Sequence, residues 1–145
     1  MVVAGGQDTL NGTNRIQVTG FEVIQINTGT GCHLEAEMLR RKVNQFHLKE
    51  SSLLFVENVG NLICPALFDF GEWAKFIILS VTEGKDKPLK YLHMFQSVQL
   101  VLLKKVDLLL SLKFDLDHCF EAALEINPTL KILQVSATTG EGMEK

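Results

Sequence analysis

The sequence predicts an α/β fold of three layers, in which a mostly parallel sheet has helices on both faces. Short apolar runs rich in β-branched residues alternate along the chain with segments of helical character, a pattern typical of parallel strands joined by helices. Lys75–Val81 is the clearest of the predicted strands. The chain has 145 residues, which is the length of one ordinary domain.

In the first half of the chain, strands are expected where apolar and β-branched residues gather, and helices where good helix formers dominate. Leu53–Val56 is a continuous apolar run, as in a strand covered on both faces. Gly5-Gly6 is expected to end the first strand and Gly20 the first helix. The predicted strands are Met1–Ala4, Phe21–Ile26 and Leu53–Val56, and the predicted helices are Thr9–Val18 and Leu34–Phe46.

The second half repeats the alternation. Pro88 is suited to the first turn of a helix, Asp115 or Asp117 can cap the next one, and Asn127-Pro128 ends it. The predicted strands are Lys75–Val81, Val98–Leu103 and Lys131–Val135, and the predicted helices run from Pro88 to about Gln96 and from Asp115 or Asp117 to Ile126.

Composition narrows the class of protein. Hydrophobic residues make up 46% and charged residues 21% of the chain, as in globular proteins. The formal net charge of −3 gives no argument for nucleic-acid binding, and no apolar run approaches the length of a membrane span. The N-terminal residues lack the basic flank and apolar stretch of a signal peptide. With 3 cysteines, an odd number, a reducing cytoplasm with free or metal-bound thiols is expected.

The segment Leu53–Pro65 organises the rest of the chain. Glu57 and then Gly60 follow the predicted strand, at the edge of the sheet where α/β proteins bind ligands. The carboxylate can face a magnesium ion directly or through water, and the glycine lets the backbone approach a phosphate. Cys64 lies farther along the same segment. We therefore hypothesise that a metal-binding thiolate is coupled to a nucleotide sensor.

Cys32 and His33 are candidates to share a metal with Cys64. Two thiolates and an imidazole suit zinc, and they suit nickel where a square-planar arrangement is available. No Cys-x-x-Cys pair is present, so each cysteine could instead be a small buried hydrophobe. Cys32 and Cys64 follow predicted strands in loops, where buried packing is less expected. Cys119 lies in an apolar helical stretch, and for it we predict the core.

Lys105 and Asp107 end another predicted strand. A carboxylate there can accept two N–H bonds from the edge of guanine, and the lysine stem can cover the base. The simpler interpretation is a solvated strand end. Ser136 and Ala137, after the next strand, favour the base site because a backbone amide there could meet the base oxygen.

Four segments of the chain carry family-like motifs, namely Gln25–Leu34, Glu57–Pro65, Leu79–Lys90 and Val135–Gly142. Together they resemble those of the hydrogenase nickel-incorporation GTPases (HypB). The resemblance implies a P-loop NTPase fold of the SIMIBI type and a GTPase (GTP hydrolase) that dimerises with nucleotide. It also implies a cytoplasmic metallochaperone that helps insert nickel into [NiFe]-hydrogenase, with a hydrogenase nickel-accessory protein and the hydrogenase large subunit as partners.

The resemblance also assigns roles to individual residues. It implies that nickel or zinc is bound by Cys32, His33 and Cys64. Glu57 and Gly60 would belong to the Mg²⁺ and γ-phosphate switch that serves GTP hydrolysis. The guanine pocket would consist of Lys105, Asp107, Ser136 and Ala137. The implied cofactors are GTP, Mg²⁺, and Ni²⁺ or Zn²⁺.

The chain departs from the family pattern at three places. No Gly-x-x-x-x-Gly-Lys-Ser/Thr phosphate loop occurs, Lys104 stands where the guanine motif has asparagine, and Gly5-Gly6 replaces a Gly-Asp pair. We therefore expect residues 1–145 to be a partial G domain, the C-terminal part without the first strand, phosphate loop and first helix. Unpaired strand edges would make the isolated chain poorly soluble or unstable.

Two other functions remain open. A truncated or degenerate copy could act only as a metal-binding or dimerisation module without GTP hydrolysis. A urease-type nickel GTPase is less favoured, because the metal motif of that family resembles Cys-Pro-His, whereas Cys32 and His33 are adjacent.

Overall fold

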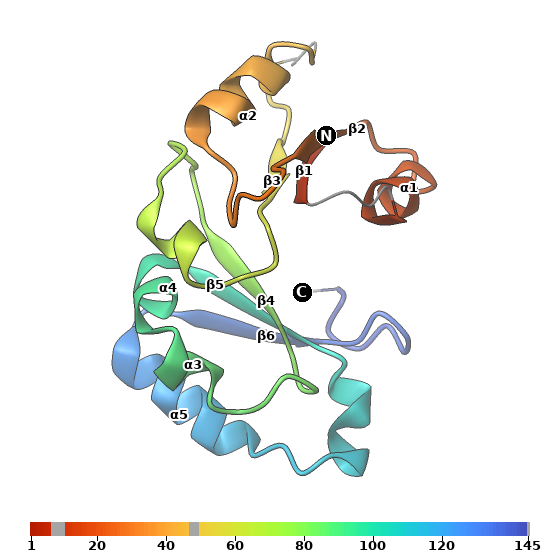
Figure 1. The fold of residues 1–145 in the computed structure, drawn as a ribbon. Helices are drawn as coiled ribbons and strands as arrows, with labels where there is room; N and C mark the ends of the chain where they lie inside the picture. The colour runs from red at the N-terminus through yellow and green to blue at the C-terminus, as the bar shows by residue number, and fades with distance from the viewer. Residues whose placement is uncertain (7–10, 47–49, 145) are drawn as a thin grey trace. The chain divides into compact units, whose positions relative to one another are not determined.

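The computed structural model describes residues 1–6, 11–46 and 50–144, and these form two compact units, Met1–Gly71 and Glu72–Lys145. Each unit contains its own three-stranded sheet (Figure 1). All of the strand pairings are parallel, so the predicted parallel α/β character is confirmed. The organisation of residues 1–145 as one partial G domain stays a prediction.

The first unit has the strand order β2-β1-β3. Its elements are β1 (Val2–Gly6), α1 (Asn11–Gln17), β2 (Val23–Asn27), α2 (Ala36–Val43), β3 (Phe55–Glu57) and the 3₁₀ helix η1 (Cys64–Leu67). In the central strand, Ala4 pairs with Gln25 on one side and with Glu57 on the other. The carboxyl ends of β2 and β3 therefore lie at one edge of the sheet, and the segments that carry Cys32 and Cys64 both start there.

The core of the first unit anchors the chain immediately after His33. Leu34 is fully buried in a cluster with Val3, Ile26, Leu39 and Phe46. A Cβ atom on Gly5 would lie 2.6 Å from two carbons of the Leu34 side chain. Glycine at this position therefore allows Leu34 to pack directly on the central strand.

Two expectations for the first unit were wrong in detail. The first strand does not end at Gly5-Gly6 but continues through both glycines, because each is paired with β2. The run Leu53–Val56 is not covered on both faces, since Leu53 is 72% and Phe55 49% exposed. The physical reason is that Leu53 precedes β3, which is short and lies at the end of its three-stranded sheet.

The second unit has the strand order β4-β5-β6. Its elements are β4 (Phe76–Ser80), α3 (Lys87–Lys90), α4 (Leu92–Ser97), β5 (Leu100–Lys104), the 3₁₀ helix η2 (Val106–Ser111), α5 (Leu116–Ile126) and β6 (Lys131–Val135). The three predicted strands are confirmed. Buried Ile77, Leu79, Val101, Leu103 and Phe95 contribute to the core of this unit.

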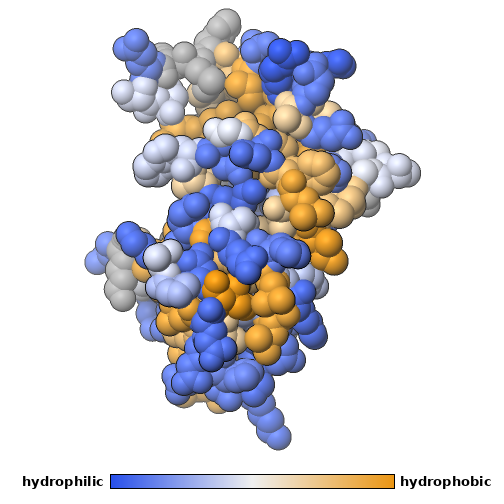
Figure 2. All heavy atoms as spheres, turned by 90° about the vertical axis from the view of Figure 1, so that its left-hand side faces the viewer, coloured by the Kyte–Doolittle hydropathy of each residue, from blue (hydrophilic) through white to orange (hydrophobic). Residues whose placement is uncertain are grey.

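The helices α3 and α4 both contact α5, and the three helices are grouped on one side of the sheet (Figure 1). The predicted helix from Pro88 to Gln96 is divided into two short helices at Tyr91, where the backbone leaves the helical region (φ −125°, ψ 46°). Apolar and polar side chains alternate on the surface over these helices (Figure 2), where Leu89, Leu92 and Leu124 are partly exposed. Among the residues that the structure describes, none of the helices has the length and hydrophobicity of a transmembrane span.

Asp115 caps α5 and is one of the two residues that the sequence predicted for this role. Its Oδ1 accepts a hydrogen bond from the His118 amide at 3.0 Å, and its Oδ2 lies 3.2 Å from Nζ of Lys85. The amide bond and then the Lys85 ammonium hold the pKa of Asp115 below its usual value. Folding therefore favours the ionised carboxylate.

The lowered pKa of Asp115 predicts a stability effect at acid pH. The stabilisation is present above the unfolded-state pKa, about 3.9, and is lost as the pH falls through the lower folded-state pKa. Asp115→Asn should retain the cap but flatten this part of the acid transition, since asparagine caps comparably. Asp115→Ala should lower the melting temperature by a few degrees at neutral pH. Thermal unfolding followed by circular dichroism from neutral to acid pH tests both, with Asp117→Asn as the control.

Candidate functional site

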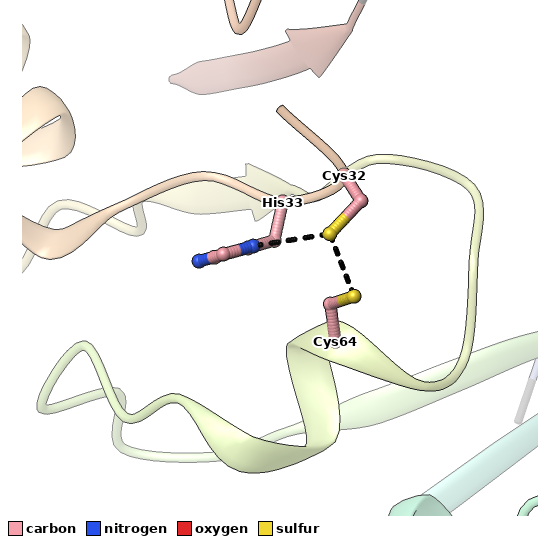
Figure 3. Close-up of side chains that lie close together, drawn as sticks. All are labelled: Cys32, His33 and Cys64. Carbon is pink, nitrogen blue, oxygen red and sulfur yellow. Dashed lines mark hydrogen bonds between the residues drawn. The ribbon is translucent and has the colours of Figure 1, made fainter. Parts of the chain in front are cut away.

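Two thiols and an imidazole meet in the first unit. Cys32 and His33 follow the turn after β2, and Cys64 is the first residue of η1. One potential ligand atom from each of these residues lies within 4.8 Å of the others. The two Sγ atoms are 2.6 Å apart, and Sγ of Cys32 is 3.5 Å from Nδ1 of His33. Figure 3 shows that Cys32 and Cys64 approach each other from separate segments, with the His33 ring beside them.

The turn that delivers Cys32 is closed by local hydrogen bonds. Oδ1 of Asn27 accepts from the Gly29 amide at 2.7 Å, and the Thr28 carbonyl accepts from the Gly31 amide at 2.9 Å. Gly29 has a positive φ of 56°, a conformation that favours glycine. The chain therefore reverses before Cys32, and buried Leu34 then fixes its direction.

The loop after β3 is held by two asparagine side chains whose roles were not predicted from the sequence. Oδ1 of Asn58 accepts from the amides of Leu34 (2.9 Å) and Val59 (2.8 Å). Oδ1 of Asn61 accepts from the amides of Ile63 (3.1 Å) and Cys64 (3.0 Å). Nδ2 of Asn61 donates to the carbonyl oxygen of Cys32. An asparagine just before a helix start often forms such a turn, and that pattern could have identified Asn61.

The two thiols influence each other. The hydrogen bond with Cys32, followed by desolvation and the charge of the neighbouring sulfur, raises the pKa of the Cys64 thiol. A divalent cation would relieve the repulsion between two thiolates and displace their protons. His33 is stacked on Phe68, with ring centroids 4.0 Å apart and planes at 12°. The imidazole plane is thus held against an aromatic ring.

This donor set fits a borderline or soft divalent metal ion. Both sulfurs and the imidazole belong to side chains that are exposed or only partly buried, so an ion can reach them. Three protein ligands leave a further coordination position open for a small molecule or a partner. Cys119, by contrast, is buried, and burial raises the pKa of its thiol to about 11. Its predicted place in the core is confirmed.

The predicted switch residues lie in the segment that runs from the last residue of β3 to Cys64. Glu57 is the last residue of β3 and is exposed. Gly60 is also exposed, and a Cβ atom added there would meet nothing within 4 Å. The backbone at Gly60 is therefore open to approach by a ligand. Asn61, which bonds to the Cys64 amide, directly follows Gly60 in the chain.

The second unit brings together two of the four residues predicted for the guanine pocket. Oδ1 of Asp107, in the first turn of η2, accepts a hydrogen bond from Oγ of Ser136 at 2.5 Å. Ser136 is fully buried, and its Oγ also accepts from the amides of Thr138 (3.3 Å) and Thr139 (3.2 Å). This network orients the Asp107 carboxylate at the carboxyl end of the sheet.

Lys105 and Ala137 flank this network in sequence. Lys105 has a left-handed backbone conformation, with φ 64° and ψ 35°, so the chain turns sharply before Asp107. The amide of Ser136 donates to the Glu141 carbonyl at 2.9 Å. The Ala137 amide makes no hydrogen bond to any residue that the structure describes, which makes it the better candidate donor to a base oxygen.

Comparison with known proteins places the chain in a family. Residues 7–134 match the family model for the CobW/HypB/UreG nucleotide-binding domain. The chain belongs to this family. The resemblance to HypB is also confirmed by curated relatives. The HypB hydrogenase maturation factor of Escherichia coli K12 is 53% identical over 144 residues, which are 99% of this chain and 50% of the relative.

A second HypB relative, from Rhizobium leguminosarum bv. viciae, is 54% identical over 143 residues, covering 99% of this chain and 48% of the relative. This chain therefore spans about half the length of these curated relatives. Its sequence contains no Gly-x-x-x-x-Gly-Lys-Ser/Thr phosphate loop.

Solved structures confirm the expected fold of this CobW/HypB/UreG chain. The crystal structure of HypB from Helicobacter pylori in complex with nickel matches with a TM-score of 0.93 and 33% identity, covering 99% of this chain and 68% of that one. HypB from Archaeoglobus fulgidus matches with a TM-score of 0.86 and 35% identity, covering 99% and 70%. The α/β fold is therefore that of the HypB P-loop GTPase-like domain.

Proposed function

We propose that this chain is the guanine-nucleotide- and metal-binding part of a GTP-dependent metallochaperone for [NiFe]-hydrogenase maturation. The observation that carries this proposal is the convergence of Cys32, His33 and Cys64 within 4.8 Å. It is supported by relatives described as hydrogenase maturation factors and by the similar HypB structure that contains nickel.

In this proposal nickel is the cargo, and zinc competes for the same ligands. The two thiols would lose their protons on binding, and the His33 imidazole would supply the third donor atom. The stacking of His33 on Phe68 limits rotation of the imidazole. The open coordination position would accept a donor from the protein that receives the ion.

Guanine would be recognised in the second unit. The Asp107 carboxylate would accept hydrogen bonds from N1–H and the exocyclic amine of guanine. The bond from Ser136 to Oδ1 would hold that carboxylate in place. The Ala137 amide would donate to the base oxygen, and the stem of Lys105 would lie over the base plane.

Metal affinity would respond to the nucleotide through the segment from Glu57 to Cys64. Glu57 would face Mg²⁺ directly or through water, and the Gly60 backbone would approach the γ-phosphate. A movement of Gly60 would pass to Asn61, the next residue, and from there to the Cys64 amide. The phosphate state would thereby alter the spacing of the two thiolates.

The test is nickel affinity in a longer protein that supplies the phosphate loop. The dissociation constant is measured by competition with a chromophoric chelator, in GDP and in a non-hydrolysable GTP analogue. We expect different affinities in the two nucleotide states. Equal affinities would contradict the coupling, while leaving metal binding itself untouched.

The second candidate is a metal-binding or dimerisation module that does not hydrolyse GTP. It is favoured by Lys104, because a lysine can donate a hydrogen bond but cannot accept one as an amide does. A guanine-nucleotide binding assay on the chain as it stands separates the two candidates. Binding of GDP or GTP would support the first of them.

The partners, oligomeric state and location are inferred from the family and not from the geometry of the site. We propose a hydrogenase nickel-accessory protein and the hydrogenase large subunit as partners, a homodimer as the functional state, and the cytoplasm as the location. Chemical cross-linking and size-exclusion chromatography with purified partners, with and without nucleotide and nickel, would test the assembly.

Asp107→Asn is expected to weaken guanine-nucleotide binding about 10- to 100-fold, since a hydrogen bond to a charged group contributes about 1.5–3 kcal/mol. The asparagine amide can donate to the C2 oxygen of xanthine, so affinity for xanthine nucleotides should rise. Both affinities are measured by fluorescent-nucleotide titration in the longer protein. Asp117→Asn, an exposed position on α5, is the control. An unchanged guanine preference would exclude Asp107 from the base pocket.

A further inference from the structure

The carboxamide of Asn61 links the two segments that carry the cysteines. Its Nδ2 donates to the carbonyl oxygen of Cys32. Its Oδ1 accepts from the backbone amides of Ile63 and Cys64, at 3.1 and 3.0 Å. One planar group therefore makes contact with the backbone of both thiol residues, although these lie 32 positions apart in the sequence.

We propose that Asn61 is a positioning residue for the metal site. Its side chain sets the separation of the Cys32 and Cys64 backbones, and thereby the geometry and strength with which the two thiolates hold a divalent ion. This inference rests on the proposed metal binding by Cys32, His33 and Cys64. It adds a residue that touches no metal but determines where two of the ligands lie.

The need for such a residue follows from local structure. Cys32 lies in a loop before α2, and Cys64 lies at the start of a 3₁₀ helix of 4 residues. Neither cysteine is held by a strand. The two thiols lose their protons only when an ion binds, so before that the spacing of the two loops depends on neutral contacts such as hydrogen bonds to the backbone. The amide of Asn61 supplies such contacts with a donor and an acceptor at fixed spacing.

The position of Asn61 also gives the site a means of release. Asn61 follows Gly60, for which we propose contact with the γ-phosphate. A shift of the backbone at Gly60 would move the carboxamide away from Cys32, from Cys64 or from both. The two thiolates would then separate, and the ion would be held less tightly.

Asn61→Asp distinguishes the hydrogen bond that the Asn61 side chain donates from the two that it accepts. The aspartate retains an acceptor for the amides of Ile63 and Cys64. It cannot donate to the Cys32 carbonyl, and it places a carboxylate oxygen against that carbonyl instead. Because the added negative charge could itself attract a cation, the comparison needs a variant with the same change of charge nearby.

Asn58→Asp is that matched control. Asn58 lies in the same loop, and its Oδ1 only accepts, from the amides of Leu34 and Val59. Aspartate preserves both bonds. The two variants therefore have the same charge and nearly the same shape, and only Asn61→Asp loses a hydrogen bond to a cysteine backbone.

The experiment measures Ni²⁺ affinity by chelator competition in the wild-type chain and both variants, with the thiols reduced. Changes in groups that orient metal ligands typically weaken affinity about 10- to 100-fold. We expect at least about 10-fold weaker binding in Asn61→Asp than in Asn58→Asp, together with an altered thiolate-to-nickel charge-transfer spectrum and faster transfer of nickel to the chelator. The melting temperatures of the metal-free variants should agree within a few degrees.

The outcomes distinguish failure of the positioning role of Asn61 from failure of the proposed metal site. Equal affinities and identical spectra in the two variants, with tight binding in the wild type, would overturn the role of Asn61 and leave the proposed metal site intact. A wild-type chain that binds neither Ni²⁺ nor Zn²⁺ would overturn the proposed metal site and this inference with it. Weaker binding explained entirely by a lower melting temperature of metal-free Asn61→Asp would also overturn the positioning role.

Discussion

Replacing Cys64 by serine is expected to weaken Ni²⁺ binding by more than about 100-fold. Loss of the groups that only orient a ligand costs about 10- to 100-fold, and this substitution removes a ligand itself. A serine hydroxyl stays protonated at neutral pH and cannot replace a thiolate. The dissociation constant is measured by chelator competition, and the number of protons released per metal ion should fall by one.

Cys119→Ala provides the matched control for this experiment. Cys119 is 3% exposed, and burial raises its thiol pKa to about 11, so it stays protonated and out of reach of an ion. Its replacement should leave nickel stoichiometry and affinity unchanged. If Cys64→Ser and Cys119→Ala bound nickel equally well, the cluster of Cys32, His33 and Cys64 would not be the metal site.

Leu34→Ala is expected to destabilise the first unit by about 2–5 kcal/mol, the usual range for truncating a buried leucine. Leu34 is fully buried and directly follows His33. Gly5→Ala should also destabilise, because its Cβ would lie 2.6 Å from two side-chain carbons of Leu34. Urea unfolding followed by circular dichroism measures both effects.

The double variant Gly5→Ala with Leu34→Ala makes this prediction specific. Truncating Leu34 removes the atoms that a Cβ at position 5 would strike. The double variant should therefore lose less free energy of unfolding than the two single variants lose in total. A coupling of about 0.5–3 kcal/mol is typical of residues in direct contact. Additive effects would show that Gly5 and Leu34 do not pack against each other as described.

The types of metal ligand were predictable from the sequence, whereas the sharing of one metal by Cys32, His33 and Cys64 was a hypothesis that local sequence could not decide. Cys32 and His33 are neighbours after a glycine-rich turn, and Cys64 follows a predicted strand, so each could be identified as a loop residue with a suitable donor atom. That identification did not require them to meet. Their convergence depends on β2 and β3 both pairing in parallel with β1, which brings the two loops to one edge of the sheet.

The supporting contacts were less predictable still. Asn58 and Asn61 lie in the segment Leu53–Pro65, but their polar side chains are equally compatible with solvent exposure. Their roles depend on the distant amide of Leu34 and carbonyl of Cys32. Similarly, Asp107 and Ser136 were each predicted for the guanine pocket, whereas the hydrogen bond between them requires β5 and β6 to be adjacent.

Local chemistry along the chain was thus sufficient for the alternation of strands and helices and for the donor types of the candidate sites, because each depends on a few neighbouring residues. It narrowed the cap of α5 to Asp115 or Asp117, and the structure decided for Asp115. Burial and convergence required the folded chain. In the apolar run Leu53–Val56, Leu54 and Val56 pack against the core but Leu53 and Phe55 are exposed. Phe55 lies in β3 at the end of its sheet, and an edge position cannot be deduced from apolarity alone. The thiols of Cys32 and Cys64 meet because parallel pairing aligns strand ends that are distant in sequence.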